Sequence, residues 1–240
     1  MKKIIENSYS TIFKGMLKAV NPIKKRIIKT ECKVHQYINH QAIIILKNDG
    51  YDYAYREMSL NIDKINEGVV WADQDFKSSN HFYNPQRSKG LYGCSNALKE
   101  CSYYYARALT KFKKGDKDKA YFYLGAACHL IQDVTVPQHV NVKLLDSHRK
   151  YEQWIIKTYR NHDSFNAYDG GLYFKSIKEF IEFNANSSMR TYNKFKNELN
   201  EELRYYKITS VILKLAQRTT AGLMLKFLND VRKLKNLSEE

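Results

Sequence analysis

The stretch from Lys117 to Asp133 constrains the fold more than any other part of the chain. It reads KDKAYFYLGAACHLIQD, and apolar or small residues fill most positions after its first turn. Asp116 is a good N-cap at its start, and Pro137 stops the helix soon after its end. A helix that is apolar on nearly all sides must be covered on all sides. We therefore expect it to be the central helix of a bundle.

Glycine and proline are scarce, at 10 and 3 of 240 residues, which favours long helices over a sheet with many turns. Apolar residues recur at mixed spacing over 51–70. Further helices are expected over 30–46, 96–113, 147–159, 176–198 and 208–234. A chain of this length defaults to one domain. We predict an all-α, single-domain multi-helix bundle.

Basic residues outnumber acidic ones by 40 to 25, a formal net charge of +15. Residues 1–34 alone hold nine basic and two acidic side chains. We expect 1–29 to form a basic amphipathic N-terminal arm, separate from a helical domain over 30–240. Such charge favours an anionic partner, whether a membrane surface, nucleic acid or a phosphate-bearing substrate. A solvated lysine-rich face explains the arm equally well.

Glu6, Asn7 and Lys14 interrupt the apolar stretch that a signal peptide needs, so classical secretion is not expected. No apolar run reaches the length of a membrane span. The sequence leaves the compartment open between the cytoplasm and export by another route.

His129 and Asp133 lie four residues apart, which places them on one face of the central helix. Both side-chain types bind metal ions, and a buried aspartate needs a cationic partner. Pro137 ends the helix and can turn His139 back to the same region. An ordinary His–Asp hydrogen bond within a core is the alternative interpretation.

A second pair with the same spacing, His148 and Glu152, follows at the start of the next helix. The two pairs and the intervening His139 supply five nitrogen and oxygen donors of the kind that zinc prefers. No cysteine belongs to this set, and the four cysteines lack C-x-x-C spacing, so we interpret them as small buried hydrophobes. A zinc site without cysteine favours open coordination and catalysis.

These motifs resemble the bacterial zinc-dependent phospholipases C from about His35 to the C-terminal helix. The segment AYFYLG at residues 120–125 is similar to the family's helix before its metal ligands. The matching residues, in order and type, are His129, Asp133, Pro137, His139, His148 and Glu152. The resemblance adds three upstream counterparts, which are His35, Asp73 and His81.

The resemblance implies three zinc sites. Asp73, His81, His129 and Asp133 would hold one ion; His139, His148 and Glu152 would hold a second; His35 with Asp133 would form part of a third. Asp133 would bridge two ions. The spacing between Asp73 and His81 is shorter than in the family, and Asp75 competes for the role of Asp73.

The third site departs from the family pattern. The family completes it with the amino group and carbonyl of a mature N-terminal Trp, about a dozen residues before the position of His35. No Trp precedes His35 here. We therefore expect two zinc ions, and a third site that is completed differently, weak or empty.

By this resemblance the chain is expected to be a phospholipase C, releasing diacylglycerol and a phosphorylated headgroup, with Asp73 orienting or deprotonating the attacking water. The expected partners are a phospholipid substrate and an anionic membrane surface, and the expected state is a monomer. One alternative is a single-strand-type zinc nuclease, which shares the fold, although Glu152 in place of Asp favours the lipase. The other is a non-catalytic helical protein that binds membranes or nucleic acid and keeps a remnant metal site.

Overall fold

The computed structural model describes residues 32–74, 80–90, 95–141 and 145–236, so the arm predicted over 1–29 and its boundary lie outside the described residues. In this part of the chain the structure is helical, with one isolated bridge between Asn84 and Lys89 and no strand. The all-α prediction is confirmed. The elements are α2 (Lys33–Asn48), α3 (Asp52–Leu60), α4 (Ile62–Asp73), α5 (Ala97–Lys113), α6 (Lys117–Asp133), α7 (Pro137–Val140), α8 (Leu145–Thr158), the 3-10 turn η4 (Asp163–Phe165), α9 (Ile177–Phe195) and α10 (Glu201–Asn236).

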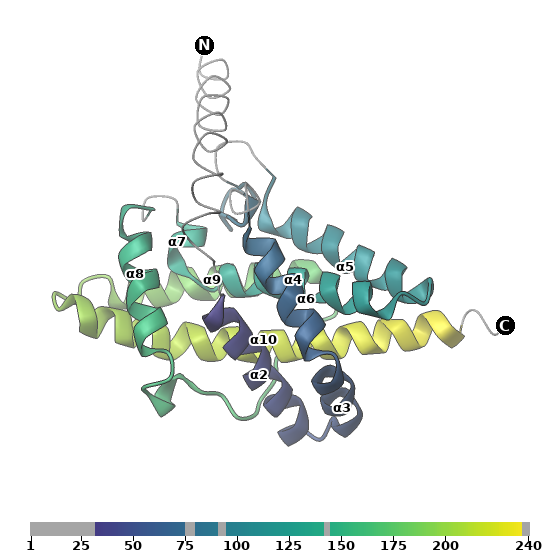
Figure 1. The fold of residues 1–240 in the computed structure, drawn as a ribbon. Helices are drawn as coiled ribbons and strands as arrows, with labels where there is room; N and C mark the ends of the chain where they lie inside the picture. The colour runs from purple at the N-terminus through teal and green to yellow at the C-terminus, as the bar shows by residue number, and fades with distance from the viewer. Residues whose placement is uncertain (1–31, 75–79, 91–94, 142–144, 237–240) are drawn as a thin grey trace, which may run out of the picture.

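Helix α6 lies at the centre of the bundle, as its composition predicted. It packs against α4, α5, α9 and α10, and its side chains from Leu124 to Asp133 are all buried (Figure 1). The helix starts and ends at the predicted residues, and the Asp116 carboxylate caps it by accepting a hydrogen bond from the Lys119 amide at 3.3 Å. Whatever polar groups α6 carries are therefore held in the core.

Two glycines let α4 and α6 meet at backbone contact. A Cβ added at Gly125 would lie 1.9 Å from the carbonyl oxygen of Ile65, and one added at Gly68 would lie 1.8 Å from that of Phe122. Any side chain at either position would force the helices apart. This crossing lies about one turn before Asp73 on α4 and before His129 on α6. The close approach therefore brings those two side chains together.

Helix α10 is 36 residues long and runs along the bundle, in contact with α2, α3, α5, α6, α8 and α9 (Figure 1). It begins at Glu201, seven residues before the predicted start at residue 208. Other helix ends also differ from the predicted ranges by a few residues; α8, for example, begins at Leu145, before the predicted start at residue 147. The segment 51–70, for which no helix bounds were predicted, forms two helices that part at Asn61. No helix of the described residues combines the length and apolar character that crossing a bilayer requires.

Candidate metal centre

The first predicted pair, His129 and Asp133, lies in the core at the C-terminal end of α6. His129 Nε2 is 3.0 Å from Asp133 Oδ2, and the two residues are 0% and 3% exposed. Burial opposes protonation of His129, but the carboxylates of Asp133 and Asp73 outweigh it and raise the pKa of the imidazole. The pair is therefore held together by charge as well as by helix geometry.

Asp133 is the shared partner of three more histidines from three other parts of the chain. Its Oδ2 lies 2.7 Å from His81 Nδ1 and 3.8 Å from His139 Nδ1, and its Oδ1 lies 3.4 Å from His35 Nε2. Burial alone would raise the pKa of this carboxyl, but the surrounding imidazoles, His129 first, hold it well below its usual range. Both carboxylate oxygens of Asp133 therefore face imidazole nitrogens.

Asp73 and His81 join His129 in one group. Asp73 is the last residue of α4, rather than a loop residue, and its Oδ1 lies 4.0 Å from His129 Nε2. His81 Nδ1 lies 3.2 Å from the same nitrogen. One donor atom from each of the three residues fits within 4.8 Å of the others. A second group of the same kind consists of His129, His35 and Asp133. Asp75, the other candidate for the role of Asp73, lies outside the described residues.

The second predicted pair forms an outer group with His139. The rings of His139 and His148 stand edge to face, with centroids 4.7 Å apart, and His148 Nε2 is 2.9 Å from Glu152 Oε1. Burial, followed by the charges of neighbouring imidazoles, lowers the pKa of His139 to about 3. Burial also opposes protonation of His148, but the Glu152 carboxylate raises its pKa. The structure therefore brings all eight predicted residues into three adjoining groups.

The donors in these groups fit zinc. Buried polar atoms are normally hydrogen-bonded, yet one ring nitrogen in each of three histidines has no hydrogen-bond partner among the described residues. These atoms are His81 Nε2, His129 Nδ1 and His139 Nδ1, while the opposite ring nitrogens of His81 and His129 face Asp133. Ligands of a tetrahedral zinc ion stand about 3.3–3.6 Å apart. The donor atoms of His129, His81, Asp133 and His35 that face one another lie 2.7 to 3.4 Å apart, at or slightly below that spacing.

Cys32 lies beside these groups, which the sequence analysis did not predict. It precedes α2, and its Sγ donates to Asp73 Oδ2 at 3.3 Å. Burial, and then the charge of Asp73, raises the pKa of the thiol well above its ordinary value. The protonated thiol therefore holds one carboxylate oxygen while the other faces His129. Cys32 and Asp73 are 41 positions apart in the sequence, so no local motif indicates this contact.

Gln132 is a second residue that sequence reasoning missed. Its Oε1 lies 2.8 Å from His35 Nδ1, and its Nε2 donates to Asn39 and Thr220 at 2.9 and 3.1 Å. A partner on one ring nitrogen fixes which way a histidine presents the other. Gln132 thus orients His35 Nε2 towards Asp133. His40, five residues after His35 on α2, is exposed.

The sequence matches the family model described as zinc dependent phospholipase C over residues 34–212, which is more than half of the chain. The chain belongs to the zinc-dependent phospholipase C family. It is 27% identical to a phospholipase C of Clostridium novyi, over 83% of this chain and 59% of that protein. A phospholipase C of Listeria monocytogenes is 24% identical, over 70% of this chain and 64% of the relative.

Two solved structures share the fold. The alpha toxin from Clostridium absonum superposes with a TM-score of 0.71 at 22% identity, over 82% of this chain and 63% of the toxin. The alpha toxin of Clostridium perfringens also gives a TM-score of 0.71. The chain thus spans about 60% of the length of these relatives. Zinc dependence follows from membership of this family. The match does not favour the alternative of a single-strand-type zinc nuclease.

Proposed function

We propose that the protein is a zinc-dependent phospholipase C that hydrolyses the phosphodiester bond of a phospholipid and releases diacylglycerol and a phosphorylated headgroup. The observation that carries the proposal is the arrangement of four histidines around the buried carboxylate of Asp133. A carboxylate surrounded in this way suits two cations better than a single closed structural ion. Phospholipases C among the relatives support the choice of reaction.

The proposed zinc ligands follow the three groups. Asp73, His81, His129 and Asp133 would hold one ion, and His139, His148 and Glu152 would hold a second. His35 and Asp133 would contribute to a third ion, for which the family's Trp ligand has no counterpart before His35. Bound zinc would polarise the phosphate, lower the pKa of a water and stabilise the leaving oxygen.

Asp73 is the proposed general base. Its side chain is 29% exposed, in contrast to the buried His129 and Asp133, so water reaches it. Cys32 donates a hydrogen bond to one of its oxygens, and the other oxygen, which faces His129, would orient a water or accept its proton. The thiol keeps the carboxylate from rotating away from the metal groups.

The proposed substrate is a membrane phospholipid, approached by the protein as a monomer. The charge of +15 supports attraction to an anionic surface, where each nearby Lys or Arg contributes about 1 kcal/mol. The side chains of Gln74 and Asn80 near the site are polar rather than aromatic, so they do not favour a choline headgroup over others.

Zinc analysis and hydrolysis assays test the proposal together. We expect two or three zinc ions per chain, and turnover of a chromogenic phosphocholine ester that chelation abolishes and zinc restores. Phospholipid vesicles and single-stranded DNA are then compared as substrates, with release of diacylglycerol expected and nucleotide release not expected. If the protein binds one zinc ion or none and hydrolyses neither substrate, the proposal is wrong and the protein is a non-catalytic helical protein.

A further inference from the structure

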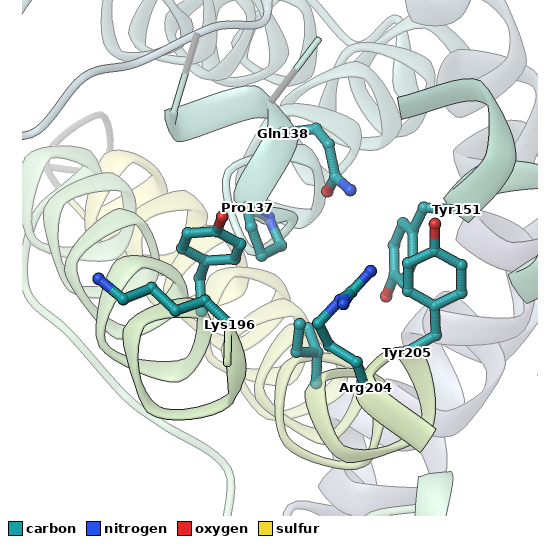
Figure 2. Close-up of a pocket in the computed structure, with 8 residues that line it drawn as sticks. Pro137, Gln138, Tyr151, Lys196, Arg204 and Tyr205 are labelled. Atoms are coloured by element: carbon teal, nitrogen blue, oxygen red, sulfur yellow. The ribbon is translucent and has the colours of Figure 1, made fainter. Parts of the chain in front are cut away.

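A cavity of about 260 Å³ lies beside the metal groups but outside them. It is formed by residues of α7 and α8 and by the junction of α9 and α10, as Figure 2 shows. None of its lining residues is a predicted zinc ligand. It is nevertheless adjacent to the metal centre, because Gln138 precedes His139 in the chain and Tyr151 precedes Glu152.

The charge of the lining is positive. Lys196 and Arg204 are among the lining residues, and no acidic side chain is. Arg204 is anchored by a hydrogen bond from its Nη1 to the carbonyl oxygen of Glu198 at 2.8 Å. Its nearest carboxylate, Glu201, is half-exposed and stands 3.6 Å away, and the carboxylate of Glu198 is paired with Lys207 at 2.6 Å. An anion can therefore enter without displacing a strong ion pair.

The side chain of Gln138 sets a second requirement on the ligand of this cavity. The residue is 6% exposed, and its Oε1 has no hydrogen-bond partner in the described part of the chain. Figure 2 shows its amide pointing into the cavity, opposite the guanidinium of Arg204. Buried amide oxygens normally accept a hydrogen bond. A ligand that carries a hydroxyl next to an anionic group satisfies both Gln138 and Arg204.

The walls limit the size of the ligand. The hydroxyl of Tyr151 is bonded to Thr209 at 2.8 Å and that of Tyr205 to Glu201 at 3.0 Å, so both rings are held in place. The volume lies below the range of about 300–1,000 Å³ that is typical of drug-sized ligands. The cavity therefore suits a polar headgroup and excludes an acyl chain.

We propose that this cavity binds a phosphate group attached to a small hydroxylated carbon chain, as in glycerol phosphate. Arg204 contacts the phosphate, Lys196 adds charge at the rim, and the Gln138 oxygen accepts the ligand hydroxyl. The ligand comes from one of two sources, a free phosphate ester in solution or the glycerol headgroup of a membrane lipid. This site goes beyond the proposed hydrolysis, since binding here requires no turnover.

Calorimetric titration of the zinc-loaded protein with glycerol 3-phosphate tests the soluble source. Arg204→Gln is expected to weaken one binding event roughly 10- to 100-fold, because a hydrogen-bonded charge is lost. Any binding at the zinc ions is expected to remain. Lys214→Gln is the matched control, since it removes the same charge from the same helix at a residue outside the lining, and we expect it to bind as the unaltered protein does.

Gln138→Glu provides a second variant that keeps the shape of the side chain. Its carboxylate would face the ligand phosphate and compete for Arg204, so the same binding event should disappear. Far-UV circular dichroism and zinc content show whether each variant is folded and loaded. If Arg204→Gln does not fold, Gln138→Glu carries the test.

Sedimentation with vesicles tests the membrane source. Phosphatidylcholine vesicles with and without phosphatidylglycerol are compared in the cold, and the lipids are assayed afterwards to confirm that they are intact. Loss of phosphatidylglycerol-dependent binding in the two variants assigns the cavity to a lipid headgroup, whereas loss of glycerol 3-phosphate binding alone assigns it to a soluble ester. Unchanged binding of both variants in both experiments would overturn the proposal, whether or not the protein proves to be a phospholipase.

Discussion

The two His-x-x-x-carboxylate pairs share a spacing and differ in everything that surrounds them. His129 and Asp133 are 3.0 Å apart with side chains 1% and 5% exposed, whereas His148 and Glu152 are 2.9 Å apart at 22% and 52%. The inner pair lies on a helix that packs on several sides, and the outer pair lies near the start of α8 at the edge of the bundle (Figure 1).

The difference shows that equal spacing does not give equal roles. A buried carboxylate needs a cationic or hydrogen-bonding partner whether or not metal is present, so Asp133 depends on its histidine partners for the stability of the metal-free protein. Glu152 is half in water and is solvated without help. Substitutions in the inner pair should therefore lower both the free energy of unfolding and zinc binding, while substitutions in the outer pair should lower zinc binding alone.

Asp133→Asn should have the largest effect. It leaves His129 and His81 buried without their carboxylate, so we expect about 3–5 kcal/mol less free energy of unfolding in the metal-free protein. Zinc content and hydrolysis should fall together. Denaturant unfolding, with zinc measured on the same samples, checks both. A variant as stable as the unaltered protein would show that the inner pair is only a ligand set.

Gly125→Ala should come next. The added Cβ would overlap the carbonyl oxygen of Ile65, which forces α4 and α6 apart and costs about 1–3 kcal/mol. Because Asp73 moves with α4, we also expect loss of zinc from the inner group. Lys117→Ala, at an exposed position of the same helix, is the control and should leave the unfolding midpoint and zinc content unchanged.

The pH dependence of unfolding distinguishes His139, whose pKa is lowered, from His129 and His148, whose pKa values are raised. The pKa of His139 is lowered from 6.5 to about 3 by burial. As the pH falls through this interval, the unfolded chain binds a proton that the folded chain does not, so stability decreases towards acid. In chelator, His139→Gln should flatten this slope by at most about 1.4 kcal/mol per pH unit. Parallel curves for the two proteins would mean that His139 is protonated in the folded state.

Glu152→Gln should have the smallest effect on stability, below about 1 kcal/mol, because the pair is half-exposed. We expect it to lose one zinc ion and retain the others, which elemental analysis measures. Set beside Asp133→Asn, it tests the comparison directly. An equal loss of stability in the two variants would remove the distinction between the inner and outer pairs.

The parts of the site that the sequence predicted are those encoded locally. Each pair lies within one helix, so spacing alone placed His129 near Asp133 and His148 near Glu152. The upstream residues His35, Asp73 and His81 came from the resemblance, because no local pattern links them to α6.

What the sequence did not predict depends on contacts between distant segments. Cys32 meets Asp73 across 41 residues, and Gln132 meets His35 across 97. The cavity likewise needs α7, α8 and α10 in place before Gln138 and Arg204 face one another. Such contacts follow from tertiary packing and leave no periodic signal in the chain.

Helix α10 contacts elements at both ends of the bundle, from α8 beside the metal groups to α5 at the opposite end (Figure 1). One continuous helix of 36 residues offers no hinge at which half of the bundle can open while the other half stays folded. A ligand that stabilises the folded state then protects all of it. Zinc should therefore slow amide hydrogen exchange along the whole of α10, although this helix carries none of the proposed ligands.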